Sequence, residues 1–144
     1  AAGLPAMVRE ALSGYLQVRS LWDARGVAAE LARWLAGRAL DRIECVWEPG
    51  MLLAAELREA LGVEGLEVAQ TLPFRDKERM KQVLDAAGIR TPRHVACATE
   101  AECRAAVERI GYPVIIKPIA GAGSADTYRI DDAAQLDAVL PRLR

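Results

Sequence analysis

The sequence has few of the residues that mark several common kinds of protein. Its 144 residues include three cysteines, an odd number without CxxC spacing, and one histidine, His94. These four side chains make a poor zinc set, so we expect reduced thiols. The formal net charge is only −1, from 19 Lys and Arg against 20 Asp and Glu. Nucleic acid is therefore not an expected partner, because binding to a phosphate backbone requires an excess of positive charge.

Long apolar runs are also absent. No run reaches the roughly 18 residues that a membrane-spanning helix needs, and residues 1–11 lack the cationic start and apolar centre of a signal peptide. Hydrophobic residues nevertheless make up 52% of the chain, enough for the core of one ordinary domain or two small ones. We therefore expect a cytoplasmic globular protein without a membrane partner.

The first half of the chain alternates between strand-like runs and runs with apolar residues at helical spacing. We predict strands over residues 15–19 and 43–47, and helices over residues 27–40 and 51–61. After Gly62 the pattern weakens, and Pro73 discourages continuous structure. This predicts an α/β unit over residues 1–73, with a domain boundary between Thr71 and Arg75.

The second half, residues 74–144, carries explicit start and stop signals. Asp76 can cap a helix that ends at Gly88, and Thr99 with Glu102 forms a capping box. The first of these helices has an apolar stripe, expected to be buried, at Met80, Val83, Leu84 and Ala87. We also predict a helix ending at Ile110, a last helix capped by Asp131 or Asp132, and strands over residues 93–96, 113–117 and 127–130.

The stretch from Val114 to Ser124 is the most informative. Three β-branched residues deliver Lys117 from a strand into a loop of small residues, Gly121, Ala122, Gly123 and Ser124. A fixed cation beside an accessible backbone suits a phosphate, and the lysine precedes the glycines, unlike in a Walker loop. The alternatives are a mobile connection between two strands and an edge-strand lysine that discourages aggregation.

Two further lysines lie four residues apart on the helix that starts near Asp76. Lys77 and Lys81 share one face of that helix, so either could reach the same ligand. The alternative is an ordinary solvated face with mixed charges, which we favour for Lys81.

Four pieces of the sequence, taken together, resemble the ATP-grasp superfamily in order and spacing. They are FRDKERMK at 74–81, AGIRTP at 87–92, GYPVIIKP at 111–118 and GAGS at 121–124. The resemblance implies that Lys77 and Lys117 contact the phosphates of ATP, and that the loop of Gly121, Ala122, Gly123 and Ser124 closes over them.

The resemblance covers about residues 41–144 and is strongest to carboxylate-amine ligases, with biotin carboxylase and carbamoyl phosphate synthetase as more distant likenesses. It implies a Rossmann-like pre-ATP-grasp domain over residues 1–73, lacking its first strand. Residues 74–144 would then be the small α+β lid subdomain of the ATP-grasp fold, truncated before the metal-binding core. Glu48 lies where family members often carry a glutamate, but a favourable place at a helix N-terminus explains it equally, so it receives no catalytic role.

The implied activity is that of an ATP-dependent ligase, which forms an acyl phosphate from a carboxylate and joins it to an amine. The implied cofactors are ATP and Mg²⁺, with the metal ligands expected downstream of Arg144. No metal ligand and no catalytic residue are therefore expected in this segment, and alone it should be inactive. A non-catalytic nucleotide-binding or interaction module, or a scaffold half of an assembly, remains the alternative, and a homo-oligomer is left open.

Overall fold

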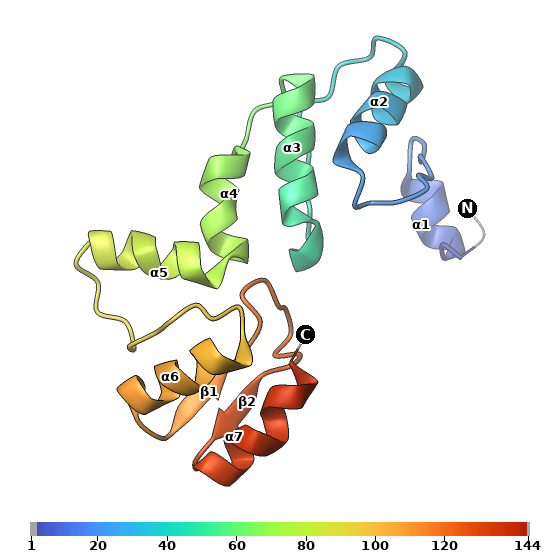
Figure 1. The fold of residues 1–144 in the computed structure, drawn as a ribbon. Coiled ribbons are helices and arrows are strands. Elements are labelled where there is room, and N and C mark those ends of the chain that lie inside the picture. Colours follow the sequence, from blue (N-terminus) through green and yellow to red (C-terminus); the bar gives the residue numbers. More distant parts are fainter. Residues whose placement is uncertain (1–2, 144) are drawn as a thin grey trace.

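The computed structural model describes residues 3–143 as two lobes joined by a single helix (Figure 1). The N-terminal lobe holds α1 (Ala6–Ala11), α2 (Ala24–Leu35), a 3-10 turn (Glu48–Gly50), α3 (Met51–Leu61) and α4 (Val68–Arg75). The joining helix is α5 (Lys77–Ala86). The C-terminal lobe holds α6 (Glu100–Ile110), β1 (Val114–Ile116), β2 (Tyr128–Ile130), α7 (Ala133–Val139) and a final 3-10 turn (Leu140–Arg142). None of the described helices is both long and apolar enough to cross a membrane.

Helix α3 is the centre of the N-terminal lobe, where it packs against both α2 and α4. Its buried face consists of Ala54, Ala55 and Leu57, and it ends at Gly62, which adopts a left-handed conformation with φ of 66°. Glycine adopts this conformation without the steric cost that a Cβ would impose. The predicted helix over residues 51–61 is thus confirmed.

Three predicted strands do not form: residues 15–19, 43–47 and 93–96 contain no strand. A strand is stable only when a neighbour completes its ladder of backbone hydrogen bonds, and among the described residues only β1 and β2 pair in this way. In the second run the Ile43 carbonyl instead accepts two bonds from the Arg58 guanidinium, at 2.7 and 2.9 Å. The side chain of α3 therefore takes the place of a sheet partner.

Two predicted helix limits also differ from the structure. Helix α2 ends at Leu35 rather than at residue 40, because Ala36 turns into a left-handed conformation. The segment around Pro73, expected to be irregular, is helix α4. A capping box between Glu67 and Gln70 starts this helix and helps to offset the backbone hydrogen bond that proline cannot donate.

The C-terminal lobe has a small, well-defined core. Strands β1 and β2 pair antiparallel, with Val114 opposite Ile130. Helices α6 and α7 and the final 3-10 turn supply the remaining buried side chains, and the core as a whole consists of Cys103, Val107, Val114, Ile130, Leu136 and Leu140. The predicted caps are confirmed: Thr99 and Glu102 form the capping box of α6, and Asp132 accepts a bond from the Gln135 amide at the start of α7.

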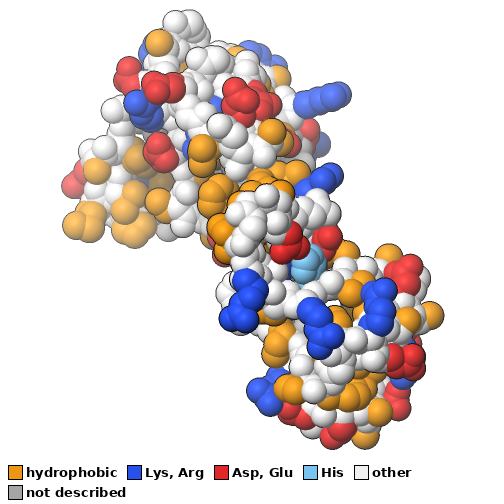
Figure 2. All heavy atoms as spheres, turned by 90° about the vertical axis from the view of Figure 1, so that its left-hand side faces the viewer, with side chains coloured by type: hydrophobic (Ala, Val, Ile, Leu, Met, Phe, Trp, Pro, Cys, Tyr) orange, Lys and Arg blue, Asp and Glu red, His pale blue; other side chains and the backbone are white. Residues whose placement is uncertain are grey.

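Helix α5 does not bury the stripe predicted for it. None of its residues is buried, and Val83 is 53% exposed, whereas Met80 and Leu84 are half-buried. The helix packs against α4 and spans the narrow waist between the lobes, where it is not covered on all sides (Figures 1 and 2). Its end is as predicted, because Gly88 is left-handed and the Ile89 amide bonds back to the Leu84 carbonyl at 2.9 Å.

Candidate phosphate-binding site

The candidate site is built on the joint between α4 and α5. Helix α4 ends at Arg75 and helix α5 begins at Lys77, so Asp76 alone separates them. The Asp76 carboxylate accepts hydrogen bonds from the amides of Glu78 and Arg79, both at 2.9 Å, as the sequence predicts. This N-cap fixes the first turn of α5 and thereby the direction in which Lys77 leaves it.

Lys77 lies against the glycine-containing loop between β1 and β2. Its amide donates to the Ile119 carbonyl at 3.1 Å, and its Nζ donates to the carbonyls of Ile119 at 3.3 Å and Gly121 at 2.9 Å. In Figure 1 this loop extends from the sheet toward the α4–α5 joint. The fold thus brings together two elements that the sequence marks separately, a lysine and a loop more than 40 residues away.

Lys117 follows the last residue of β1 and is exposed. Its charge acts on Lys77, because the pKa of Lys77 is lowered first by desolvation and then by repulsion from Lys117 and Arg75. Attraction from Glu48 and Asp76 opposes this lowering. A bound polyanion would offset the repulsion that Lys77 experiences from these two cations.

The loop itself has an unusual backbone. Gly123, Ser124 and Asp126 all have positive φ, at 62°, 60° and 52°. For serine and aspartate this conformation is uncommon, and such strain is often found at ligand-binding loops. The Ala125 amide bonds to the Ala122 carbonyl at 3.2 Å, which closes a turn at the tip. The tip of the loop is therefore a tight turn with a strained backbone.

The structure adds a residue that sequence reasoning assigned to a mixed-charge surface. The Arg75 side chain is only 7% exposed, forms an ion pair with Glu48 and donates to the Ala120 carbonyl at 2.9 Å. The partners lie 27 and 45 residues away, and no sequence spacing connects them. The sequence pointed to Arg75 in one way: it directly precedes Asp76 and Lys77, and so it lies on the same joint.

Other candidate groups lie elsewhere. Lys81 donates to the Pro92 carbonyl at 3.2 Å, which fits the solvated face favoured for it.

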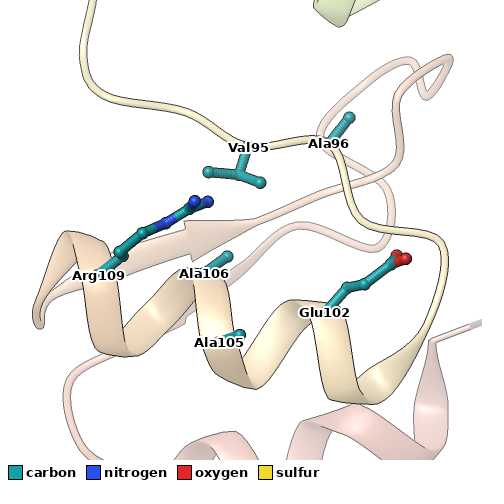
Figure 3. A pocket seen from close by; sticks show the side chains of 6 residues that line it. All are labelled: Val95, Ala96, Glu102, Ala105, Ala106 and Arg109. Carbon is teal, nitrogen blue, oxygen red and sulfur yellow. The ribbon is translucent and has the colours of Figure 1, made fainter.

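A depression of about 390 Å³ lies between α6 and the preceding segment, lined by Val95, Ala96, Glu102, Ala105, Ala106 and Arg109 (Figure 3). It is separate from the joint and the loop, and Glu102 is occupied there by the capping box. Within residues 3–143, no three His, Cys, Asp or Glu side chains are grouped to hold a metal ion.

Parts of this chain are similar to known proteins. Residues 76–142 match the family model described as the carbamoyl-phosphate synthase L chain, ATP binding domain. D-Alanine–D-alanine ligase from Stutzerimonas stutzeri (strain A1501) is 41% identical over 123 residues, which cover 79% of this chain and 38% of the ligase. The D-alanine–D-alanine ligase from Xylella fastidiosa is 39% identical over 117 residues, covering 73% of this chain and 38% of that protein.

A solved structure shows the same fold. The L-amino acid ligase from Bacillus licheniformis matches with a TM-score of 0.74 at 22% identity, over 88% of this chain and 30% of that chain. The matched segment is similar to an ATP binding domain, and the fold is similar to part of a solved ligase structure. The chain is thus similar to ATP-grasp proteins of the carboxylate-amine ligase-like kind. It spans somewhat more than a third of the length of the D-alanine–D-alanine ligases just described.

Proposed function

We propose that this chain binds the phosphates of ATP for a ligase that joins a carboxylate to an amine. Lys77 and Lys117 hold the phosphates, and the loop of Gly121, Ala122, Gly123 and Ser124 closes over them. The observation that carries the proposal is the contact of Lys77 Nζ with the carbonyls of Ile119 and Gly121. A cation and a strained loop meet there, beside a second cation at a strand end.

The reaction proposed for the complete ligase proceeds in two steps. A carboxylate oxygen attacks the γ-phosphorus of ATP, which gives an acyl phosphate and ADP. An amine then attacks the acyl carbon and displaces inorganic phosphate, leaving an amide. The names of the relatives give D-alanine as both of the molecules that are joined. We therefore propose small amino-acid-like molecules as the carboxylate and amine substrates. The loop would shield the acyl phosphate from water.

Mg²⁺ neutralises the phosphates in phosphoryl transfer. The described residues offer no cluster of acidic or imidazole ligands for it, so they do not fit a magnesium site. We propose that the chain alone binds ATP without turning it over. We also propose that residues 1–73 correspond to the Rossmann-like pre-ATP-grasp domain and residues 74–144 to the lid subdomain.

The proposal is tested by measuring ATP affinity of the chain with titration calorimetry. Replacing Lys77 or Lys117 with alanine removes one charge-assisted contact to phosphate, worth about 1.5–3 kcal/mol, so each change should weaken binding by roughly 10- to 150-fold. Lys81→Ala is the matched control, because this lysine lies one helical turn from Lys77 but bonds to the Pro92 carbonyl. Failure of the unaltered chain to bind ATP, or an equal loss in all three variants, would contradict the proposal.

A further inference from the structure

Arg75 is the single buried charged side chain among residues 3–143. A guanidinium removed from water is costly unless its donors are satisfied. Here one terminal nitrogen pairs with Glu48, whose side chain is 49% exposed, and the other donates to the Ala120 carbonyl at 2.9 Å. The two partners belong to different parts of the fold, the 3-10 turn before α3 and the β1–β2 loop.

The residues on either side of Ala120 are the ones that Lys77 holds. Lys77 Nζ bonds to the carbonyls of Ile119 and Gly121, and Arg75 bonds to the carbonyl between them. Three consecutive carbonyls at the base of the loop are thus bound in alternation by two cations. Two side chains from the α4–α5 joint therefore fix three neighbouring peptide groups of this turn.

The two cations differ in what a nucleotide would do to them. A phosphate that binds Lys77 competes with the carbonyls of Ile119 and Gly121 for the same ammonium protons. Arg75 is already paired with Glu48, and the separate nitrogens of its planar guanidinium bond to Glu48 and to Ala120 in a fixed geometry. The bond to Ala120 therefore persists when Lys77 turns to a ligand.

We propose that Arg75 is a positioning residue: it ties Glu48 to Ala120 and keeps the base of the glycine-containing loop in place while Lys77 exchanges loop carbonyls for phosphate. The inference rests on the proposed function for its role in ATP binding. The tether itself exists without nucleotide and is testable without it. Arg75 touches no phosphate in this scheme and acts through the loop.

The test is hydrogen exchange of the loop amides, residues 120–127, followed by mass spectrometry in the absence of nucleotide. Arg75→Met keeps the length of the side chain but removes the tether, and it should speed exchange in the loop by about tenfold to a hundredfold. Exchange in α6 and α7 should be unchanged. Arg79→Met is the matched control, because Arg79 is exposed on α5 and bonds only locally to Gln82.

Two further variants keep the inference falsifiable if Arg75→Met does not fold. Glu48→Gln removes the ion pair from a half-exposed partner and should speed loop exchange to a smaller extent, and Arg75→Lys should not restore the slow exchange. Loop exchange equal to that of the Arg79 variant, or acceleration spread equally over α3, α4 and the loop, would overturn the tether. Absence of ATP binding in the unaltered chain would overturn the proposed function. The exchange measurement would still test the tether, because it is made without nucleotide.

Discussion

Replacing Ile130 with alanine should strongly destabilise the C-terminal lobe. Ile130 is 0% exposed and belongs to the core between the sheet and the helices α6 and α7. The change removes three buried carbons, worth about 2.4 kcal/mol at about 0.8 kcal/mol each. The cavity left behind raises the expected loss to about 3–4 kcal/mol, whereas Ile130→Val should cost about 1 kcal/mol.

Strand β1 offers a matched control for this prediction. Ile115 lies on the other face of the same two-stranded sheet, opposite Arg129, and is 56% exposed. Ile115→Ala removes the same three carbons, but less than half of the surface of this side chain is removed from water on folding. The free energy of unfolding should therefore fall by only about 1 kcal/mol.

Urea unfolding followed by circular dichroism at 25 °C gives the free energy of unfolding for each variant. The slope with urea should stay constant, so the difference appears as a shift of the midpoint. Equal losses for the two alanine variants would refute the assignment of Ile130 to the core, as would a loss below about 1 kcal/mol for Ile130→Ala.

Two predictions concern the start of α6 and the charge of Lys77. Thr99→Ala removes the bond from the Glu102 amide at 3.2 Å and should lower the free energy of unfolding by about 1 kcal/mol. Thr99→Ser should restore most of this loss. An alanine variant as stable in urea as the unaltered chain would contradict the cap. The pKa of Lys77 lies below the usual 10.5 because of desolvation and then Lys117, and phosphate prefers the protonated amine. ATP affinity should therefore fall as pH rises through this lowered pKa, and Lys117→Met should raise the pKa of Lys77 in a nuclear magnetic resonance titration; an unchanged value would contradict the coupling.

The parts of the fold that were predictable from the sequence are those made by near neighbours. Asp76, Thr99 and Asp132 each cap a helix through bonds to amides two or three residues ahead, so the pattern is complete within a short stretch. The predictions of strands over residues 43–47 and 93–96 were wrong, because a strand depends on a partner that no local pattern specifies.

The candidate site divides along the same line. Lys77, Lys117 and the loop belong to short motifs, and the resemblance to a family joined those motifs into one prediction. The meeting of Lys77 with the loop is seen only in the folded chain, as is the burial of Arg75 between Glu48 and Ala120. Burial of an arginine is not visible in a sequence where it is surrounded by other charged residues.

The joint between α4 and α5 has a consequence for how the site tolerates change in chain length. A single residue, Asp76, separates the two helices. One additional helical residue turns the following side chain by about 100° and moves it about 1.5 Å along the axis. Arg75 and Lys77 bind neighbouring carbonyls of one peptide segment, so an insertion or deletion at Asp76 would remove one of them from it. Spacing along the chain is thus as strict a requirement of this site as the chemical identity of its side chains.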